Sequence, residues 1–210
     1  MGALMMAPLC CFYDVLTKYT KYVKIFIVVR PTKQRKDIRR KEILAAALEC
    51  FVQYGLHKTT FEDVARRAEV SRSLIYSYFE DKKHLFLSVV KDVLDEQRLK
   101  TEMVLKSGLG DEEKFLEILE SWGVKLYAKG ADSPHGGELL EEGLRAWEQV
   151  GVKYKEYLVR VLAKFVGGAD VAEFVVLSIK GLQSDHPSVP VLRKRAKLLV
   201  ELCRRRSRRP

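Results

Sequence analysis

Residues 59–85 read TTFEDVARRAEVSRSLIYSYFEDKKHL and decide the fold of the N-terminal part of the chain. The spacing of apolar residues predicts a short helix from Phe61 and a second short helix after Ser71, with a tight turn at Glu69 and Val70 between them. The start of a third helix follows. A short polar-faced helix projected from such a turn is the common protein device for entering the DNA major groove. The stretch therefore predicts a helix-turn-helix.

Polar residues stand where each of these helices needs an N-cap. Thr60 precedes the first helix, and Asp63 lies three residues on, where a capping-box acid reaches back. Ser71 and Asp81 hold the cap positions of the second and third helices. Apolar residues then recur at helical spacing on the inner faces: Phe61, Val64, Ala65 and Ala68, then Ile75 and Phe79, then Leu85, Phe86, Val89, Val90, Val93 and Leu94.

Several separated features keep the same register over residues 38–85. They are the helix end Phe51-x-x-x-Gly55, the pairs Thr59-Thr60 and Val70-Ser71, and the residues Tyr76, Phe79 and Lys82. With these features the segment resembles the DNA-binding domain of the TetR family of bacterial and archaeal transcriptional regulators. Glu69 departs from the commoner turn glycine, and Leu74 replaces a small polar residue often found there. The departures leave the predicted fold unchanged and affect which operator is read.

The resemblance implies that four residues bind phosphate oxygens, which positions the domain without reading sequence: Thr60, Tyr76, Tyr78 and Lys82. The chemistry agrees with this role. Hydroxyl groups donate to phosphate, and Lys82 adds a positive charge beside the exposed N–H groups of a helix N-terminus.

Four other residues are expected to reach the base edges. Arg72 is the strongest candidate, because its planar fork can bind guanine O6 and N7 together. Ser73 and Ser77 suit either kind of base edge, and Leu74 suits a thymine methyl group. The plainer alternative is that the polar residues of this helix merely cover the surface of a small helical domain.

The 210-residue chain has a net charge of +10 that is concentrated near its ends. Residues 30–41 carry a net charge of +6 and residues 193–210 one of +8, whereas residues 85–192 carry −5. A basic segment directly before the helix-turn-helix predicts phosphate or minor-groove contact. The final RRRSRRP predicts a basic tail from residue 204, either disordered or adding affinity for DNA.

Residues 101–205 carry helical apolar patterns, with loops indicated at 130–137, 167–168 and 185–190. This pattern suits the second domain of the resembled family, which binds an inducer among its helices and dimerises through its last two. We therefore predict an all-α protein. Its predicted parts are an N-terminal extension and basic arm (1–33), a three-helix helix-turn-helix domain (34–81), a helical effector-binding and dimerisation domain (82–203) and a basic tail (204–210).

Five aromatic residues are candidates for lining an apolar effector pocket: Trp122, Tyr127, Trp147, Tyr154 and Tyr157. Aromatic residues at helical spacing are also the ordinary material of a core, so this alternative stays open. Glu138, Glu141 and Glu142 favour a cationic effector or simply form a solvated acidic face.

Two C-terminal helical faces predict a homodimer. The first comprises Val171, Phe174, Val175, Ser178, Ile179 and Leu182, and the second Val191, Leu192, Arg195, Leu198, Leu199 and Leu202. Two such helices from each subunit would form a four-helix bundle on a two-fold axis. The alternative is that both faces pack within their own subunit.

Other classes of protein find little support in the sequence. It contains no nucleophile elbow, P-loop or dinucleotide fingerprint, so neither an enzyme nor a cofactor is predicted. His135 and Glu138 lack a third metal ligand at suitable spacing, and the four cysteines form no framework, which predicts a reduced cytoplasmic protein without a metal. No apolar run approaches the ~20 residues that span a bilayer.

Residues 1–29 fit no element of the resembled family and lack the pattern of a signal peptide. One hypothesis is that translation starts near Val28 or Val29, and an alternative is that YVKIFIVV forms an edge strand or a sticky arm.

The prediction as a whole is a homodimeric regulator, most simply a repressor, that binds a palindromic operator in double-stranded DNA and is released by a small-molecule effector. Two alternatives remain: a non-specific architectural DNA-binding protein, and a small-molecule binding protein that has lost its operator.

Overall fold

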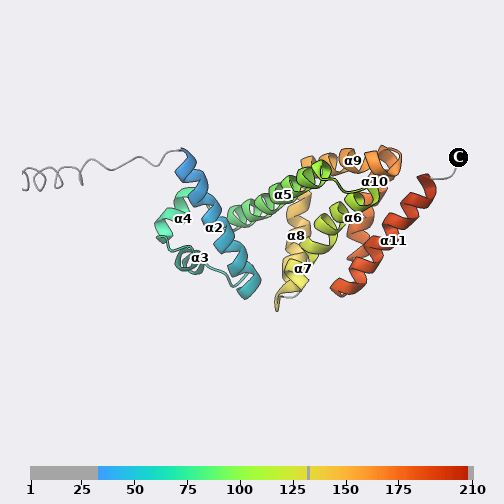
Figure 1. Cartoon of the computed structure of the whole chain (residues 1–210). Helices are drawn as coiled ribbons and strands as arrows, with labels where there is room; N and C mark the ends of the chain where they lie inside the picture. The colour runs from blue at the N-terminus through green and yellow to red at the C-terminus, as the bar shows by residue number, and fades with distance from the viewer. Residues whose placement is uncertain (1–32, 132, 208–210) are drawn as a thin grey trace, which may run out of the picture. The chain divides into compact units, whose positions relative to one another are not determined.

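The computed structural model describes residues 33–131 and 133–207, and every regular element within them is a helix (Figure 1). In order, the elements are α2 (Lys33–Tyr54), α3 (Phe61–Arg67), α4 (Arg72–Tyr78), α5 (Lys82–Lys106), α6 (Asp111–Leu119), η1 (Glu120–Lys125), α7 (Leu126–Ala131), α8 (Gly136–Val150), α9 (Val152–Val166), α10 (Ala169–Leu182) and α11 (Val189–Ser207). The predicted all-α fold, with a helix-turn-helix followed by a second helical domain, is confirmed.

The predicted N-caps begin the helices as expected. The Ser71 hydroxyl accepts the N–H of Leu74 at 3.2 Å, and the Asp81 carboxylate accepts the N–H of His84 at 2.7 Å. At α3, Thr60 and Asp63 form a complete capping box. Each cap satisfies a backbone donor that the helix itself leaves without a partner.

A first buried cluster holds α2, α3, α4 and the beginning of α5 together. Its members include the α2 residues Ile43, Leu44, Ala47, Cys50 and Phe51, and, from the inner faces predicted for the next three helices, Val64, Ala65, Ile75, Phe79, Leu85, Phe86 and Val89. The rings of Phe51 and Phe86 meet edge to face, with centroids 5.5 Å apart. Burial of this apolar surface orients α3 and α4 and leaves their polar faces outward.

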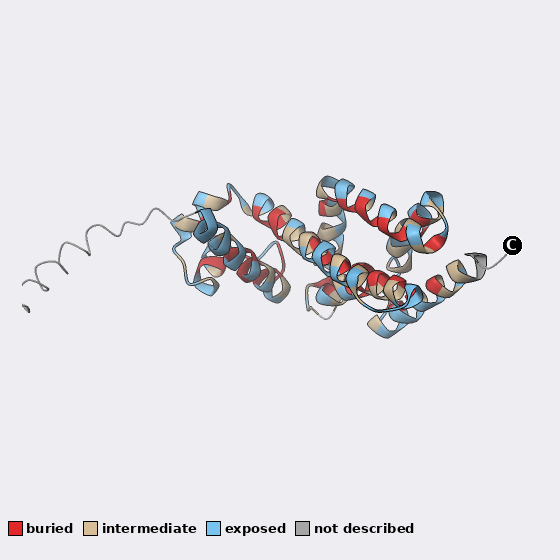
Figure 2. Ribbon diagram, turned by 45° about the horizontal axis from the view of Figure 1, so that its top comes forward, coloured by how far each residue is buried: buried red, intermediate tan, exposed pale blue. Residues whose placement is uncertain are grey.

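The 25-residue helix α5 contributes to two clusters. Its first turns supply Leu85, Phe86 and Val89 to the first cluster, and Leu94 belongs to the second. Figure 2 shows buried residues recurring along the helix. Because one helix joins both cores, the predicted domain boundary at residue 82 stays a prediction.

The second cluster draws on α6, η1, α9, α10 and α11. Its buried members are Leu94, Phe115, Ile118, Leu119, Trp122, Tyr154, Tyr157, Leu158, Val161, Leu162, Val166, Ala172, Val175 and Val200. Helices α9 and α10 pack on each other and are joined by Gly167, whose φ of 78° is a left-handed conformation that side chains disfavour.

Both basic ends are helical where the structure describes them. Residues 33–41 lie in the first turns of α2, and all but the first of them belong to the segment 34–81 that was predicted as the helix-turn-helix domain. At the other end, α11 continues to Ser207, three residues beyond the predicted start of the tail at Arg204. Residues 33–41 and 204–207 are rich in lysine and arginine, which favour helices, and contain neither glycine nor proline. The predictions for residues 1–32 and 208–210 lie outside the described residues.

Candidate DNA-reading surface and effector cavity

The turn between α3 and α4 is set by a left-handed residue. Glu69 has a φ of 52°, a region that residues other than glycine rarely adopt. Its N–H donates to the carbonyl of Arg66 at 3.4 Å, and the N–H of Val70 donates to the carbonyl of Ala65 at 3.0 Å. These two bonds form a Schellman motif. Glu69, which stands where the resembled family commonly has glycine, is therefore the residue of this turn with the left-handed conformation that glycine adopts most easily.

Helix α4 presents Arg72 at its first position. The Arg72 guanidinium donates to the Tyr76 hydroxyl at 3.1 Å and lies 5.5 Å from the centre of its ring. The Tyr76 ring in turn contacts Phe61, with centroids 4.8 Å apart. Arg72 is itself exposed, and Tyr76 is 50% exposed, so their contact orients the guanidinium without burying it.

The other predicted base readers lie on the same helix. Ser73 and Ser77 are exposed, and Leu74 is half-buried. The Ser77 hydroxyl donates to the carbonyl of Leu74 at 2.6 Å, and the Ser73 and Ser71 hydroxyls are 3.0 Å apart. Both hydroxyls retain acceptor capacity, which suits base-edge donors.

Thr60 takes part in the cap in two ways. Its hydroxyl accepts the N–H of Asp63 at 3.2 Å and donates to the Asp63 carboxylate at 2.6 Å. These hydrogen bonds from Thr60 lower the pKa of Asp63, because they stabilise the charged carboxylate. The one hydroxyl proton of Thr60 is therefore engaged, and phosphate binding by this side chain would require Asp63 to release it.

Two further predicted phosphate ligands have different surroundings. Tyr78 is half-buried against the first cluster, with its ring 6.2 Å from that of Phe79. Lys82 donates from Nζ to the backbone carbonyls of His57 at 2.7 Å and Thr59 at 3.2 Å. An ammonium group has three donors, so one N–H of Lys82 remains for a phosphate.

The loop before α3 is also held from α8. The Glu138 carboxylate accepts the backbone N–H of His57 at 2.8 Å. The Ser133 hydroxyl donates to the carbonyl of Val52 at 2.5 Å, close to the end of α2. No motif in the sequence indicated these contacts, because they join residues 81 positions apart.

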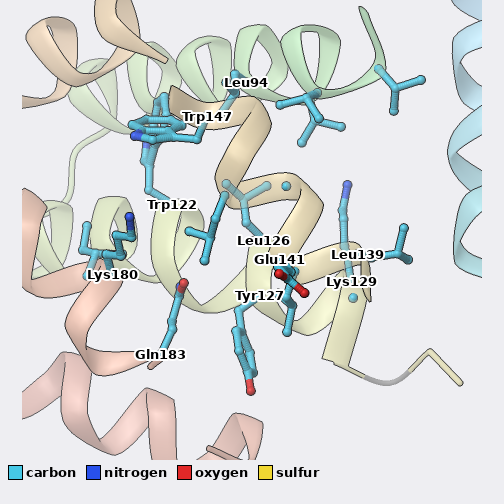
Figure 3. Close-up of a pocket in the computed structure, with 18 of the residues that line it drawn as sticks. Leu94, Trp122, Leu126, Tyr127, Lys129, Leu139, Glu141, Trp147, Lys180 and Gln183 are labelled. Atoms are coloured by element: carbon cyan, nitrogen blue, oxygen red, sulfur yellow. The ribbon is translucent and has the colours of Figure 1, made fainter. Parts of the chain in front are cut away.

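A cavity of about 760 Å³ lies among α2, α5, η1, α7, α8, α9 and α10 (Figure 3). Its size falls within the ~300–1,000 Å³ typical of small-molecule sites. The α8 residues Leu140, Gly143, Leu144 and Trp147 all line it, so one mainly apolar face of this helix is turned toward the cavity.

The five aromatic candidates divide into two groups. Trp122, Tyr127 and Trp147 line the cavity. Tyr154 and Tyr157 are not among its lining and pack in the second cluster, where their hydroxyls donate to Asp95 and Glu102, each at 2.7 Å. Burial and these carboxylates raise the pKa of both tyrosines, so they remain neutral.

Trp122 owes its position to an irregular backbone. It lies in η1, a π-helical segment of 6 residues between α6 and α7. Single π turns within α-helices occur frequently at functional sites. The Trp122 ring meets that of Trp147 edge to face, with centroids 6.4 Å apart, at the wall of the cavity.

The predicted dimer faces are partly wrong. Val175 and Leu192 have exposed fractions of 0% and 2% because they pack within their own chain. Arg195 binds both carboxylate oxygens of Asp185 at 2.6 Å. The apolar side chains left exposed on α10 and α11 are Phe174, Leu177, Val191, Leu198 and Leu202. Helical periodicity located the stripes but could not tell which edge faces inward.

Among the described residues no group of three or more His, Cys, Asp or Glu side chains is placed to hold a metal ion. Within the same ranges no helix combines the length and the apolarity needed to cross a bilayer.

Comparison with known proteins relates the N-terminal part of the fold to regulators by sequence. Residues 43–89 match the family described as bacterial regulatory proteins, tetR family. The HTH-type transcriptional regulator RutR of Escherichia coli (strain K12) is 40% identical over 57 residues, which make up 27% of this chain and 27% of RutR. The chain therefore spans little more than a quarter of the length of this curated relative.

Solved structures extend the similarity over the whole helical fold. A transcriptional regulator from Cytophaga hutchinsonii ATCC 33406 has a TM-score of 0.60 at 19% identity and covers 78% of this chain and 95% of its own. FadR from Bacillus subtilis in complex with stearoyl-CoA has a TM-score of 0.53 at 17% identity and covers 78% and 96%. At these identities the similarity establishes the fold alone.

Proposed function

We propose that this chain, which belongs to the TetR family by its helix-turn-helix, is a transcriptional regulator that reads a specific DNA sequence with α4. The observation that carries the proposal is a capped α4 whose Arg72, Ser73 and Ser77 side chains are exposed on one short helix. Arginine binding guanine in the major groove is the commonest specific contact between protein and DNA.

The remaining residues of the surface would fix the domain on the duplex. We assign phosphate binding to Tyr76, Tyr78, Lys82 and, after release from Asp63, Thr60. The basic residues of the first turns of α2 would add attraction that does not depend on sequence. In this arrangement Leu74, which is half-buried, would contact a thymine methyl group.

A two-fold dimer would give the regulator a palindromic operator. The exposed Phe174, Leu198 and Leu202 supply apolar surface on α10 and α11 for a bundle with the same helices of a second copy. Two reading helices related by a two-fold axis then meet half-sites one helical turn, or a multiple of it, apart.

The cavity would bind the small molecule that controls DNA binding. Of the similar structures, FadR of Bacillus subtilis was solved with stearoyl-CoA, which shows that this fold holds ligands of that kind in that protein. An effector that prefers a conformation with wrongly spaced reading helices shifts the population away from the operator-bound form. Release on effector binding makes the protein a repressor.

Footprinting on the DNA that flanks the protein's own gene tests the proposal, at moderate salt and with competitor DNA. We expect a protected, roughly palindromic site. Diffuse protection that disappears as salt rises would instead identify a non-specific binder acting through its basic segments. A complete lack of DNA binding would identify a small-molecule binding protein that has lost its operator.

A further inference from the structure

The walls of the cavity offer few free polar groups to a ligand. The Trp122 indole donates to Thr101 at 2.8 Å, and the Tyr127 hydroxyl donates to the carbonyl of Pro187 at 2.8 Å. The Gln183 amide donates to the carbonyl of Gly123 at 2.8 Å. These bonds use the indole N–H, the Tyr127 hydroxyl proton and one N–H of the Gln183 amide, and most of the remaining lining residues are apolar. A polar group on the buried body of a ligand would lose more hydrogen bonds with water than it gained, so we expect the body of the ligand to be apolar.

The acidic residues near the cavity are already bound. Glu141 and Glu142 both accept from the Arg145 guanidinium, at 2.6 Å and 2.5 Å. Glu138 accepts the N–H of His57. Of the three, only Glu141 lines the cavity, and the Arg145 guanidinium offsets its charge, which weakens the argument for a cationic effector.

Three lysines line the cavity, and their partners differ. Lys155 pairs with Glu173 at 2.6 Å, and Lys180 lies 3.5 Å from Glu148. Lys129 on α7 makes no ion pair with any carboxylate in the described ranges. The pKa of Glu96 is lowered mainly by its hydrogen bond from Lys100, at 2.6 Å, and to a smaller extent by the positive charge of Lys129. Figure 3 shows the Lys129 side chain among the cavity-lining residues.

We propose that the effector is an amphipathic carboxylate whose apolar chain fills the cavity and whose anionic end binds the Lys129 ammonium. The apolar walls take up the chain through burial of hydrocarbon surface. Lys129 is exposed, so it lies where the cavity opens to solvent and can meet a headgroup that remains partly hydrated. The inference rests on the proposed function, since it names the chemistry of the effector.

Intrinsic fluorescence provides a direct readout, because the chain contains 2 tryptophans and both line the cavity. We would titrate the full chain, without DNA, with dodecanoate, dodecanol and dodecyltrimethylammonium, each below its aggregation limit. A charge-assisted hydrogen bond makes dodecanoate bind about tenfold more tightly than dodecanol, or better. Equal binding of the acid and the alcohol, tighter binding of the ammonium compound, or no binding of any of the three would overturn the inference.

Variants locate the headgroup. In Lys129→Met the preference for dodecanoate over dodecanol should disappear, while Lys129→Arg should keep it. Lys125→Met is the matched control, because Lys125 is bound to Glu117 and does not line the cavity. A preference that survives in Lys129→Met, or that is lost equally in Lys125→Met, would contradict the assignment. Circular dichroism would establish that each variant is folded. If Lys129→Met does not fold, the assignment is tested by Lys129→Arg alone, which should keep the preference for dodecanoate.

The two levels of the account fail separately. A chain that binds dodecanoate with the expected preference but protects no operator would leave the assignment of the ligand to the cavity standing and end the proposed function. A chain that protects an operator but does not distinguish the three headgroups would do the reverse.

Discussion

The Oε1 atom of Glu138 accepts the backbone N–H of His57 at 2.8 Å, although the two residues are 81 positions apart. Leu139 and Leu140, which follow Glu138 on α8, line the cavity. The His57 carbonyl accepts from Lys82, the first residue of α5 and a predicted phosphate ligand. Continuous contacts thus lead from the cavity wall to the loop before α3, and we predict that displacement of α8 by a ligand shifts this loop through Glu138.

We predict that Glu138→Ala loosens this loop. Without the carboxylate the His57 N–H is bound only by water, so amide hydrogen exchange over residues 55–60 should become faster. Glu142→Ala is the control, because Glu142 binds Arg145 on the same helix. Exchange that is unchanged in Glu138→Ala, or equally faster in both variants, would remove Glu138 from the connection.

The left-handed turn predicts a gain in stability from one substitution. Glu69→Gly should raise the free energy of unfolding by roughly 0.5–1 kcal/mol, since relief of the left-handed strain exceeds the entropy that glycine loses on folding. Glu62→Gly makes the same chemical change inside α3 and should lower it by about 1 kcal/mol. Urea denaturation of both variants provides the comparison, and a loss of stability in both would refute the strain argument.

The capping box gives a pH dependence. Thr60→Ala should cost about 0.5–2 kcal/mol at neutral pH. The pKa of Asp63 is lower in the folded protein than in the unfolded chain, so its contribution is complete above the unfolded pKa of ~3.9 and is lost as the pH falls through the folded value. The difference in unfolding free energy between wild type and Thr60→Ala should therefore shrink below pH ~4. A difference that is constant from pH 7 to pH 3 would contradict the role of the Asp63 charge.

The exposed edge of α11 predicts the oligomeric state. If the chain forms the proposed dimer, Leu198→Glu should convert it to monomers in sedimentation velocity experiments, because the substitution places a charge in the apolar bundle. Leu99→Glu is the matched control on α5, where Leu99 is 64% exposed against 54% for Leu198. If Leu198→Glu stays dimeric, the interface lies elsewhere.

Local sequence signals predicted the helix-turn-helix well. Thr60, Ser71 and Asp81 were recognised as caps because a cap binds a backbone group only two or three residues away. The inner faces of α3, α4 and α5 followed from helical spacing for the same reason. Such short-range relationships can be predicted because the residues that take part are close together in the sequence.

Relationships across the fold could not be predicted in this way. No residue near Glu138 in the sequence indicates that it binds His57. The sequence predicted that Lys82 binds phosphate, but it could not show that Lys82 also donates to the backbone carbonyls of His57 and Thr59. Tyr154 and Trp122 both lie at helical spacing and both pack in the second cluster, yet only Trp122 also lines the cavity. A hydrophobic stripe predicts that one face of a helix is buried. Which residues pack against that face depends on the neighbouring helices, which the stripe does not identify.

The most direct test of the central claim is the affinity of Arg72→Ala for the footprinted operator and for random DNA, measured at the same moderate salt. Specific sites are typically bound about 10³-fold more tightly than random DNA, or better. Each bidentate base contact is worth ~1–3 kcal/mol, and the substitution removes one from each half-site, so operator affinity should fall by ~2–6 kcal/mol while random binding stays nearly unchanged. An equal loss on both DNAs would show that Arg72 contacts only phosphate and that α4 does not read the sequence as proposed.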